Sequence, residues 1–121
     1  MGLVETLRLK IGEGEDQTSH VSMTVDEIHL NYAGSLHGGV VSTLIDIAIA
    51  RAIRKAVGPE SVIATVTLNL TFIGAVSDGA LDARGKVTFK GNRLVHGDAE
   101  VKAGDRLIAR GTGTWYVTPQ K

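Results

Sequence analysis

Residues 39–58 read GVVSTLIDIAIARAIRKAVG and predict the one long helix of this chain. No Pro or Gly interrupts the segment from Gly39 to Val57 until Gly58-Pro59 ends it. On a helical wheel the basic residues form one narrow stripe, made of Arg51, Arg54 and Lys55. A helix that is apolar on nearly all its other sides is one that other elements surround, so we predict a buried central helix.

Asp46 is the exception on this helix. It lies away from the basic stripe, and its helical neighbours are Ser42, Thr43, Ile49 and Ala50. A carboxylate among aliphatic side chains is costly unless it has a partner or a chemical role. Burial would disfavour its charged form and make it a better base. The alternative is a structural carboxylate bonded to backbone, or one exposed in a gap.

The helix is entered through the segment Asn31-Tyr-Ala-Gly-Ser-Leu-His37-Gly38-Gly39. Helix starts expose unpaired backbone N–H groups that favour negative charge. The N–H of Gly38 is therefore a candidate oxyanion donor, although the two glycines could serve only a tight entry to the helix. An oxyanion site and a base or nucleophile are the groups that acyl transfer requires.

Alternating apolar residues predict the sheet. Residues 7–11 and 21–25 alternate on either side of Gly12–Asp16 and favour a hairpin. Four further strands are predicted at Val62–Ile73, Ala80–Phe89, Leu94–Ala103 and Leu107–Val117. Because Gly-containing loops join these four strands, we expect consecutive strands to pair in an antiparallel meander.

Three of these strands carry small residues in the middle of one face. The positions concerned are Ala83, Gly85, Gly97, Ala99, Ala109, Gly111 and Gly113. Glycine weakens a strand unless another backbone needs the room, so the strands should form a trough that the helix fills. We predict an α+β fold in a single domain, residues 1–121, with a curved antiparallel sheet wrapped around one central helix.

The first long strand has an uncharged polar side made of Thr65, Thr67, Asn69 and Thr71. A side that faces solvent usually holds Lys and Glu, so either another subunit covers this one or the composition is chance.

Composition narrows the class of function. Thirteen basic and thirteen acidic residues balance, which disfavours nucleic acid or an anionic membrane as the main partner. The absence of cysteine excludes a disulfide framework and a thiolate nucleophile. His20, His29 and His96 lack metal-ligand spacing, so no metal site is expected. With neither a signal peptide nor a long apolar span recognisable, the cytoplasm is the expected location.

The combination of Asn31, Gly34, His37-Gly38-Gly39 and an acid at Asp46 resembles the hotdog-fold thioesterases. The resemblance is strongest to the phenylacetate-degradation (PaaI-like) branch and extends over residues 20–117. It implies an acyl-CoA thioesterase that needs no metal or redox cofactor. The chain departs from the family at Gly74-Ala75, where a basic residue and a Pro are common, and at Ala50, where many relatives have a hydroxyl.

The resemblance also implies roles for individual residues. Asp46 would be general base or nucleophile, and Gly38 would bind the thioester oxygen. His37 would assist at the carbonyl or the leaving sulfur, unless it is only a hydrogen-bonded structural residue at the helix entry. Asn31 would position the carbonyl or a water, unless it only stabilises a turn. Candidate substrate contacts are Gly39, which allows close approach, and Lys90 and Arg93, which either hold CoA phosphates or form a charged hairpin tip.

Gly38 and Asp46 cannot serve one substrate from a single helix. Eight residues separate them by about 12 Å along the axis, whereas each must lie about 3 Å from the reacting carbonyl. Two antiparallel copies of the helix could bring Gly38 of one chain beside Asp46 of another. We therefore expect a homodimer with shared sites, and the uncharged strand favours a dimer of dimers.

Other functions remain open at this point. A hotdog protein could bind an acyl-CoA or acyl carrier without turnover, although a binder has no need of a buried acid. Hotdog hydratases pair an Asp with a His before the helix, but Asp26 and His29 lie too close together for that pattern. A non-enzymatic assembly protein would leave Asp46 unexplained.

Overall fold

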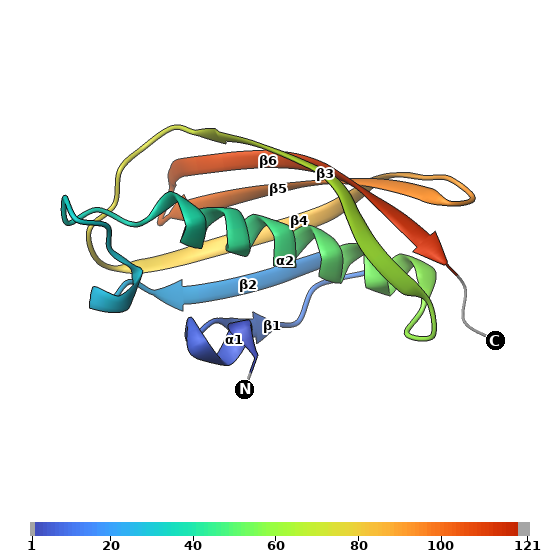
Figure 1. The fold of residues 1–121 in the computed structure, drawn as a ribbon, viewed down its shortest axis with the longest axis horizontal. Helices are drawn as coiled ribbons and strands as arrows, with labels where there is room; N and C mark the ends of the chain where they lie inside the picture. Colours follow the sequence, from blue (N-terminus) through green and yellow to red (C-terminus); the bar gives the residue numbers. More distant parts are fainter. Residues whose placement is uncertain (1, 119–121) are drawn as a thin grey trace.

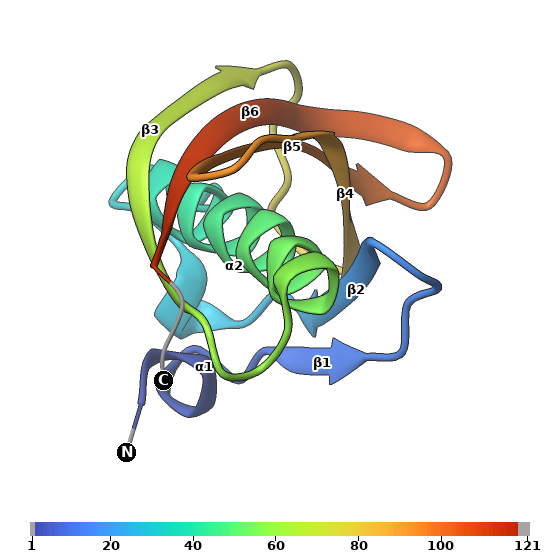
Figure 2. The same cartoon turned by 90° about the vertical axis from the view of Figure 1, so that its right-hand side faces the viewer.

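The computed structural model describes residues 2–118 and consists of one long helix inside a curved antiparallel sheet (Figures 1 and 2). The elements are α1 (Leu3–Thr6), β1 (Lys10–Gly12), β2 (Thr18–Thr24), the 3-10 turn η1 (Glu27–His29), α2 (Gly38–Val57), β3 (Val62–Phe72), β4 (Ala80–Lys90), β5 (Leu94–Ala103) and β6 (Arg106–Thr118). The predicted sheet wrapped around one central helix is confirmed. Within residues 2–118, no helix is both long and apolar enough to cross a membrane.

The strand order of the sheet is β1-β2-β4-β5-β6-β3. The predicted hairpin between β3 and β4 is wrong, because β3 pairs with β6 and residues 73–79 cross over to the other half of the sheet. Turn residues in the crossover indicate that the chain changes direction, but they do not determine which strand pairs with β3. Both edges of β4 are taken by β2 and β5, whereas β6 has a free edge for β3.

The small residues of the sheet make room for α2, as predicted. A Cβ atom at Gly97 would lie 2.5 Å from Cγ2 of Ile49, and one at Gly111 would lie 2.8 Å from Cγ2 of Ile45. At Gly85 the added atom would collide with the carbonyl of Ala48. The middle of the helix therefore packs directly against the sheet backbone.

Gly97→Ala is expected to destabilise the fold by about 1–3 kcal/mol, because the extra methyl overpacks a filled core. The change should appear as a lower midpoint in urea unfolding at an unchanged slope. In the control Gly38→Ala, the new Cβ would meet only the Phe72 ring at an ordinary 3.5 Å. Equal midpoints for the Gly97 variant and the unaltered chain would contradict the close packing of α2.

A bulge divides the polar residues of β3. The register shifts between Thr65 and Thr67, so Thr65 shares the helix-facing side with Trp115 while Thr67 lies opposite Thr114 on the outer side. The prediction that Thr65, Thr67, Asn69 and Thr71 share one face is therefore wrong for Thr65. The extra residue at the bulge changes the alternation of side chains along the strand.

Contacts at the ends of the chain's helices add to this description, and one sequence interpretation changes. Leu7, expected in a strand, follows the short helix α1 as its C-cap. Two residues of the basic stripe of α2 bind neighbouring loops: Arg54 donates to the carbonyl of Ser61, and Lys55 donates to the carbonyl of Gly14. These two side chains stabilise the C-terminal turn of α2 and the β1–β2 loop.

Candidate active site

The start of α2 leaves one backbone donor free. His37 is the N-cap, and its Nδ1 accepts the N–H of Gly39 at 2.9 Å. Val40 and Val41 direct their N–H groups to the carbonyl of His37. For the N–H of Gly38, no acceptor exists within residues 2–118. Gly38 is half-buried, so its N–H is a donor available to a ligand at the positive end of the helix.

This cap assigns different functions to the two residues beside Gly38. Gly39 has its N–H occupied by the cap, so it offers a ligand close approach and no hydrogen bond. Because Nδ1 of His37 accepts a hydrogen bond, the neutral ring carries its proton on Nε2. The ring is exposed, and Nε2 has no partner among the described residues, so it can donate to a ligand.

Asn31 stabilises the loop that leads to the helix. Its Oδ1 accepts the N–H groups of Ala33 at 2.9 Å and Ser35 at 3.1 Å. Gly34 allows the turn with φ of 83°. These contacts support the interpretation of Asn31 as a turn residue, and they leave only its Nδ2 group for a substrate.

Asp46 is half-buried, and the full burial expected from its apolar neighbours is not found. Its Oδ1 accepts a hydrogen bond from the hydroxyl of Thr65 at 3.2 Å. Among the described residues it forms no ion pair, so its charge is not neutralised by Lys or Arg. Sequence reasoning missed Thr65, because only the bulge in β3 turns this side chain toward α2.

Lys90 and Arg93 are not brought near Gly38 within one chain. They flank the β4–β5 turn, which lies beyond the C-terminal end of α2, at the opposite end of the molecule from the helix start (Figure 1). Both side chains are exposed. Residues 2–118 contain no group of three or more His, Asp or Glu residues that could hold a metal ion.

The pair Asp26 and His29 has a structural function. His29 is fully buried, its Nδ1 accepts the N–H of Asp26 at 2.9 Å, and its Nε2 bonds the carbonyl of Leu7 at 2.7 Å. Asp26 itself forms an ion pair with Arg8. Both ring nitrogens of His29 are therefore engaged with backbone and are not available for hydratase chemistry.

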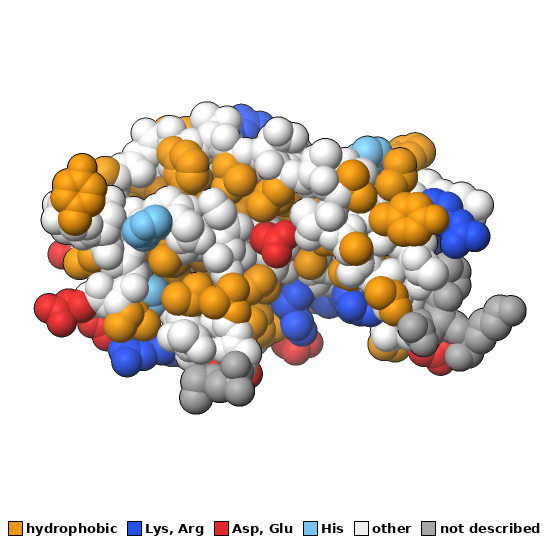
Figure 3. Space-filling view, viewed as in Figure 1, with side chains coloured by type: hydrophobic (Ala, Val, Ile, Leu, Met, Phe, Trp, Pro, Cys, Tyr) orange, Lys and Arg blue, Asp and Glu red, His pale blue; other side chains and the backbone are white. Residues whose placement is uncertain are grey.

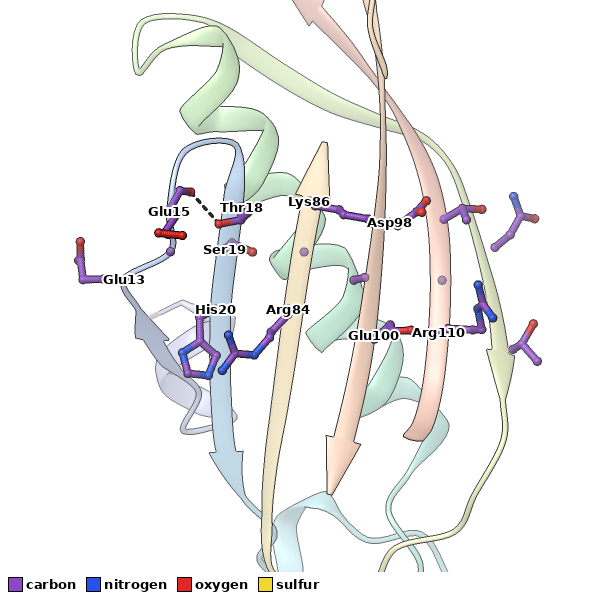
Figure 4. A pocket seen from close by; sticks show the side chains of 17 residues that line it. Glu13, Glu15, Thr18, Ser19, His20, Arg84, Lys86, Asp98, Glu100 and Arg110 are labelled. Atoms are coloured by element: carbon purple, nitrogen blue, oxygen red, sulfur yellow. Dashed lines mark hydrogen bonds between the residues drawn. The ribbon is translucent and has the colours of Figure 1, made fainter. Parts of the chain in front are cut away.

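A hollow of about 670 Å³ lies on the outer side of the sheet, away from these residues (Figure 4). Arg84, Glu100 and Arg110 form a row of alternating charge across β4, β5 and β6. None of the predicted site residues lines it. Because the apposed charges are of opposite sign and open to solvent, we interpret this hollow as part of the charged outer surface.

Comparison with known proteins identifies the family. A family model described as "Thioesterase superfamily" matches residues 33–109. The Pseudomonas aeruginosa protein named "Putative esterase PA0474" is 33% identical over 98 residues, which span 80% of this chain and 73% of that protein. An Archaeoglobus fulgidus protein named "Putative esterase" is 32% identical over 116 residues, 94% of this chain and 73% of that protein.

Solved structures show the same fold. The conserved protein PA5202 from Pseudomonas aeruginosa matches with a TM-score of 0.94 at 27% identity, over 98% of this chain and 94% of that one. A mutant of the phenylacetic acid degradation protein PaaI from Thermus thermophilus matches with a TM-score of 0.86 at 24% identity, over 93% of this chain and 96% of that one. The family model matches more than half of the length of this chain, and the chain therefore belongs to the thioesterase superfamily.

Proposed function

We propose that this chain is an acyl-CoA thioesterase that hydrolyses a thioester to a carboxylic acid and free CoA. The observation that carries the proposal is the free N–H of Gly38 on the same helix as the unneutralised Asp46. A donor for the developing oxyanion and a carboxylate base or nucleophile are what acyl transfer requires. Membership of the thioesterase superfamily supports this class of reaction.

The N–H of Gly38 donates to the thioester oxygen and stabilises the negative charge that develops there. Asp46 either removes a proton from a water that attacks the carbonyl carbon, or attacks that carbon itself to form an anhydride. Collapse of the tetrahedral intermediate breaks the C–S bond and expels the CoA thiolate. In the second route, water then hydrolyses the anhydride, which releases the carboxylic acid and regenerates Asp46. His37 precedes Gly38 in the sequence, and the N–H at its Nε2 can donate a hydrogen bond to the departing sulfur.

The two groups belong to different chains of a homodimer in this proposal. Along α2, Gly38 and Asp46 are separated by about 12 Å, too far to share one carbonyl. An antiparallel second copy would bring its Asp46 to the first copy's Gly38. The same arrangement would carry the partner's β4–β5 turn toward Gly38, where Lys90 and Arg93 could bind CoA phosphates.

Strand β3 supports this dimer. It is an edge of the sheet, eleven residues long, and contains no charged residue. Long uncharged edges pair with other strands unless they are protected. Exposed Val62, Val66 and Phe72 lie on this strand, and hydrophobic groups occur over the face that carries α2 and β3 (Figure 3).

The outer side of β3 supports further association. Thr67, Asn69 and Thr71 face outward there, with no charge among them. We propose that two dimers associate through this side. Light scattering should then give four times the chain mass of 12.8 kDa. A monomer mass at micromolar concentration would contradict both interfaces.

A thiol-release assay with a panel of acyl-CoA thioesters tests the function itself. Hydrolysis should proceed without added metal, and the corresponding acyl-pantetheines, which lack the nucleotide phosphates, should show a raised KM. Tight binding of acyl-CoA with no thiol release would favour a non-catalytic acyl-CoA or acyl-carrier binding protein instead.

Thr65→Val is expected to lower kcat about 10-fold, because it removes the hydroxyl that holds Asp46 in place. The control Thr67→Val makes the same chemical change on the outer side of the bulge, away from α2. Steady-state kinetics should show the loss in kcat for the Thr65 variant alone. Equal losses in both variants would indicate that β3 as a whole is disturbed.

A further inference from the structure

A hollow of about 370 Å³ opens beside Gly38. Half-exposed Phe72 and Ile73 form its rim. Its floor consists of buried aliphatic side chains, those of Leu36, Val41, Val76 and Ile108. Among the described residues that line it, Ser35 has the one polar side chain and none is charged.

Backbone hydrogen bonds fix the walls of this hollow. Leu36 donates to the carbonyl of Val76 at 2.7 Å, which ties the loop before α2 to the crossover after β3. Ile73 and Gly74 donate to the carbonyl of Ile108 at 2.7 and 3.0 Å. The walls are therefore held in place by β6 and by the helix entry, which makes the hollow a preformed site.

A charged group close in sequence to this floor hydrogen-bonds the backbone of a residue in the wall of the hollow. Arg106 lies two residues before Ile108, and its guanidinium donates to the carbonyl of Ala75 at 3.2 Å. It is not among the residues that line the hollow. The side chains that a ligand in the hollow meets are therefore hydrocarbon, apart from the hydroxyl of Ser35.

We propose that this hollow receives the acyl group of the substrate and selects acyl groups that are apolar and uncharged. This inference rests on the thioesterase function proposed above. Gly38 lines the hollow, so a carbonyl bound to its N–H leaves the acyl chain beside the apolar floor. The volume equals that of about a dozen water molecules, which suits an acyl group and is too small for a whole acyl-CoA.

The proposal predicts how kcat/KM depends on the acyl group. Each methylene removed from water should raise kcat/KM about fourfold, so butanoyl-CoA should exceed acetyl-CoA about fifteenfold. Hexanoyl-CoA should exceed adipoyl-CoA at least about 100-fold, because the terminal carboxylate of adipoyl-CoA would lose its hydration without gaining a partner. The two compounds have acyl chains of six carbons and differ in that charge.

A variant pair locates the effect. Ile73→Lys places a cation at the rim and should narrow the preference for hexanoyl-CoA over adipoyl-CoA at least about tenfold. The control Ile28→Lys alters a side chain of similar exposure, 49% against 50%, that does not line the hollow. Its hexanoyl-to-adipoyl ratio should equal that of the unaltered enzyme.

Each outcome bears on the proposal. Equal kcat/KM for acetyl-CoA and hexanoyl-CoA in the unaltered enzyme would overturn the acyl pocket and leave the thioesterase function standing. If folded Ile73→Lys keeps the same ratio of kcat/KM for hexanoyl-CoA to kcat/KM for adipoyl-CoA, the acyl pocket is likewise overturned and the thioesterase function still stands. If that variant does not fold, the chain-length series of the unaltered enzyme decides. Failure to release thiol from any of these thioesters would overturn both proposals.

Discussion

Asp46→Asn is expected to lower kcat/KM for acyl-CoA hydrolysis at least about 100-fold while the fold is retained. The amide keeps the size of the carboxylate and can still accept the hydrogen bond from Thr65. It has too little basicity to deprotonate water and is too weak a nucleophile to attack a thioester. Steady-state thiol release, with circular dichroism as a check on folding, measures the effect.

Asp105→Asn is the matched control, because Asp105 is an exposed acid in the turn between β5 and β6. Its activity should equal that of the unaltered chain. Near-normal turnover in the Asp46 variant would exclude a base or nucleophile at this position and contradict the proposed mechanism.

Gly38→Pro should lower kcat about 100- to 1,000-fold, the usual loss when one oxyanion donor is removed. Proline has no N–H, yet it is well tolerated as the first residue of a helix, which is the position of Gly38 in α2. His37 already has the extended backbone that a residue before proline prefers, with φ of −66° and ψ of 135°. The helix should therefore persist while its free donor is lost.

Gly38→Ala distinguishes the donor from the flexibility of glycine. Alanine keeps the N–H, and its methyl would meet the Phe72 ring at 3.5 Å, an ordinary contact. We expect kcat for this variant within about fivefold of normal. If alanine and proline reduce kcat equally, the backbone freedom of glycine is what matters and the N–H is not the oxyanion donor.

The sequence predicted the parts of the fold that depend on local pattern. The predicted helix starts one residue after the observed one and ends at the same residue, because Gly58-Pro59 stops it. The close packing at Gly97 and Gly111 followed from small residues placed in the middle of neighbouring strands. These features depend on the periodicity and the size of residues, and both can be determined from a single sequence.

Features that depend on the partner of a strand could not be predicted. The pairing of β3 with β6 joins segments distant in sequence, and the turn signals at residues 77–79 do not specify it. The bulge at Val66 has no signature in an apolar and threonine-rich strand. Without the bulge, Thr65 could not be assigned to the side of Asp46.

The candidate site was predicted in part. Asp46 and the N–H of Gly38 were proposed from residue type and position. His37 was considered as a hydrogen-bonded residue at the helix entry, but its cap on the N–H of Gly39 was not predicted. That cap explains which amide is free, because it occupies Gly39 and leaves Gly38. The burial of Asp46 was overestimated, since helical neighbours do not reveal how closely β3 covers this side of α2.

Subunit mixing is the most direct test of a site shared between two chains. Asp46→Ala chains and Gly38→Pro chains should each be inactive alone, but a mixed dimer would contain one site with both an intact Gly38 and an intact Asp46. Random exchange of equal amounts should restore about a quarter of normal activity. Exchange can be verified by mass spectrometry of intact complexes. No recovery in a mixture that demonstrably contains mixed dimers would contradict the shared site.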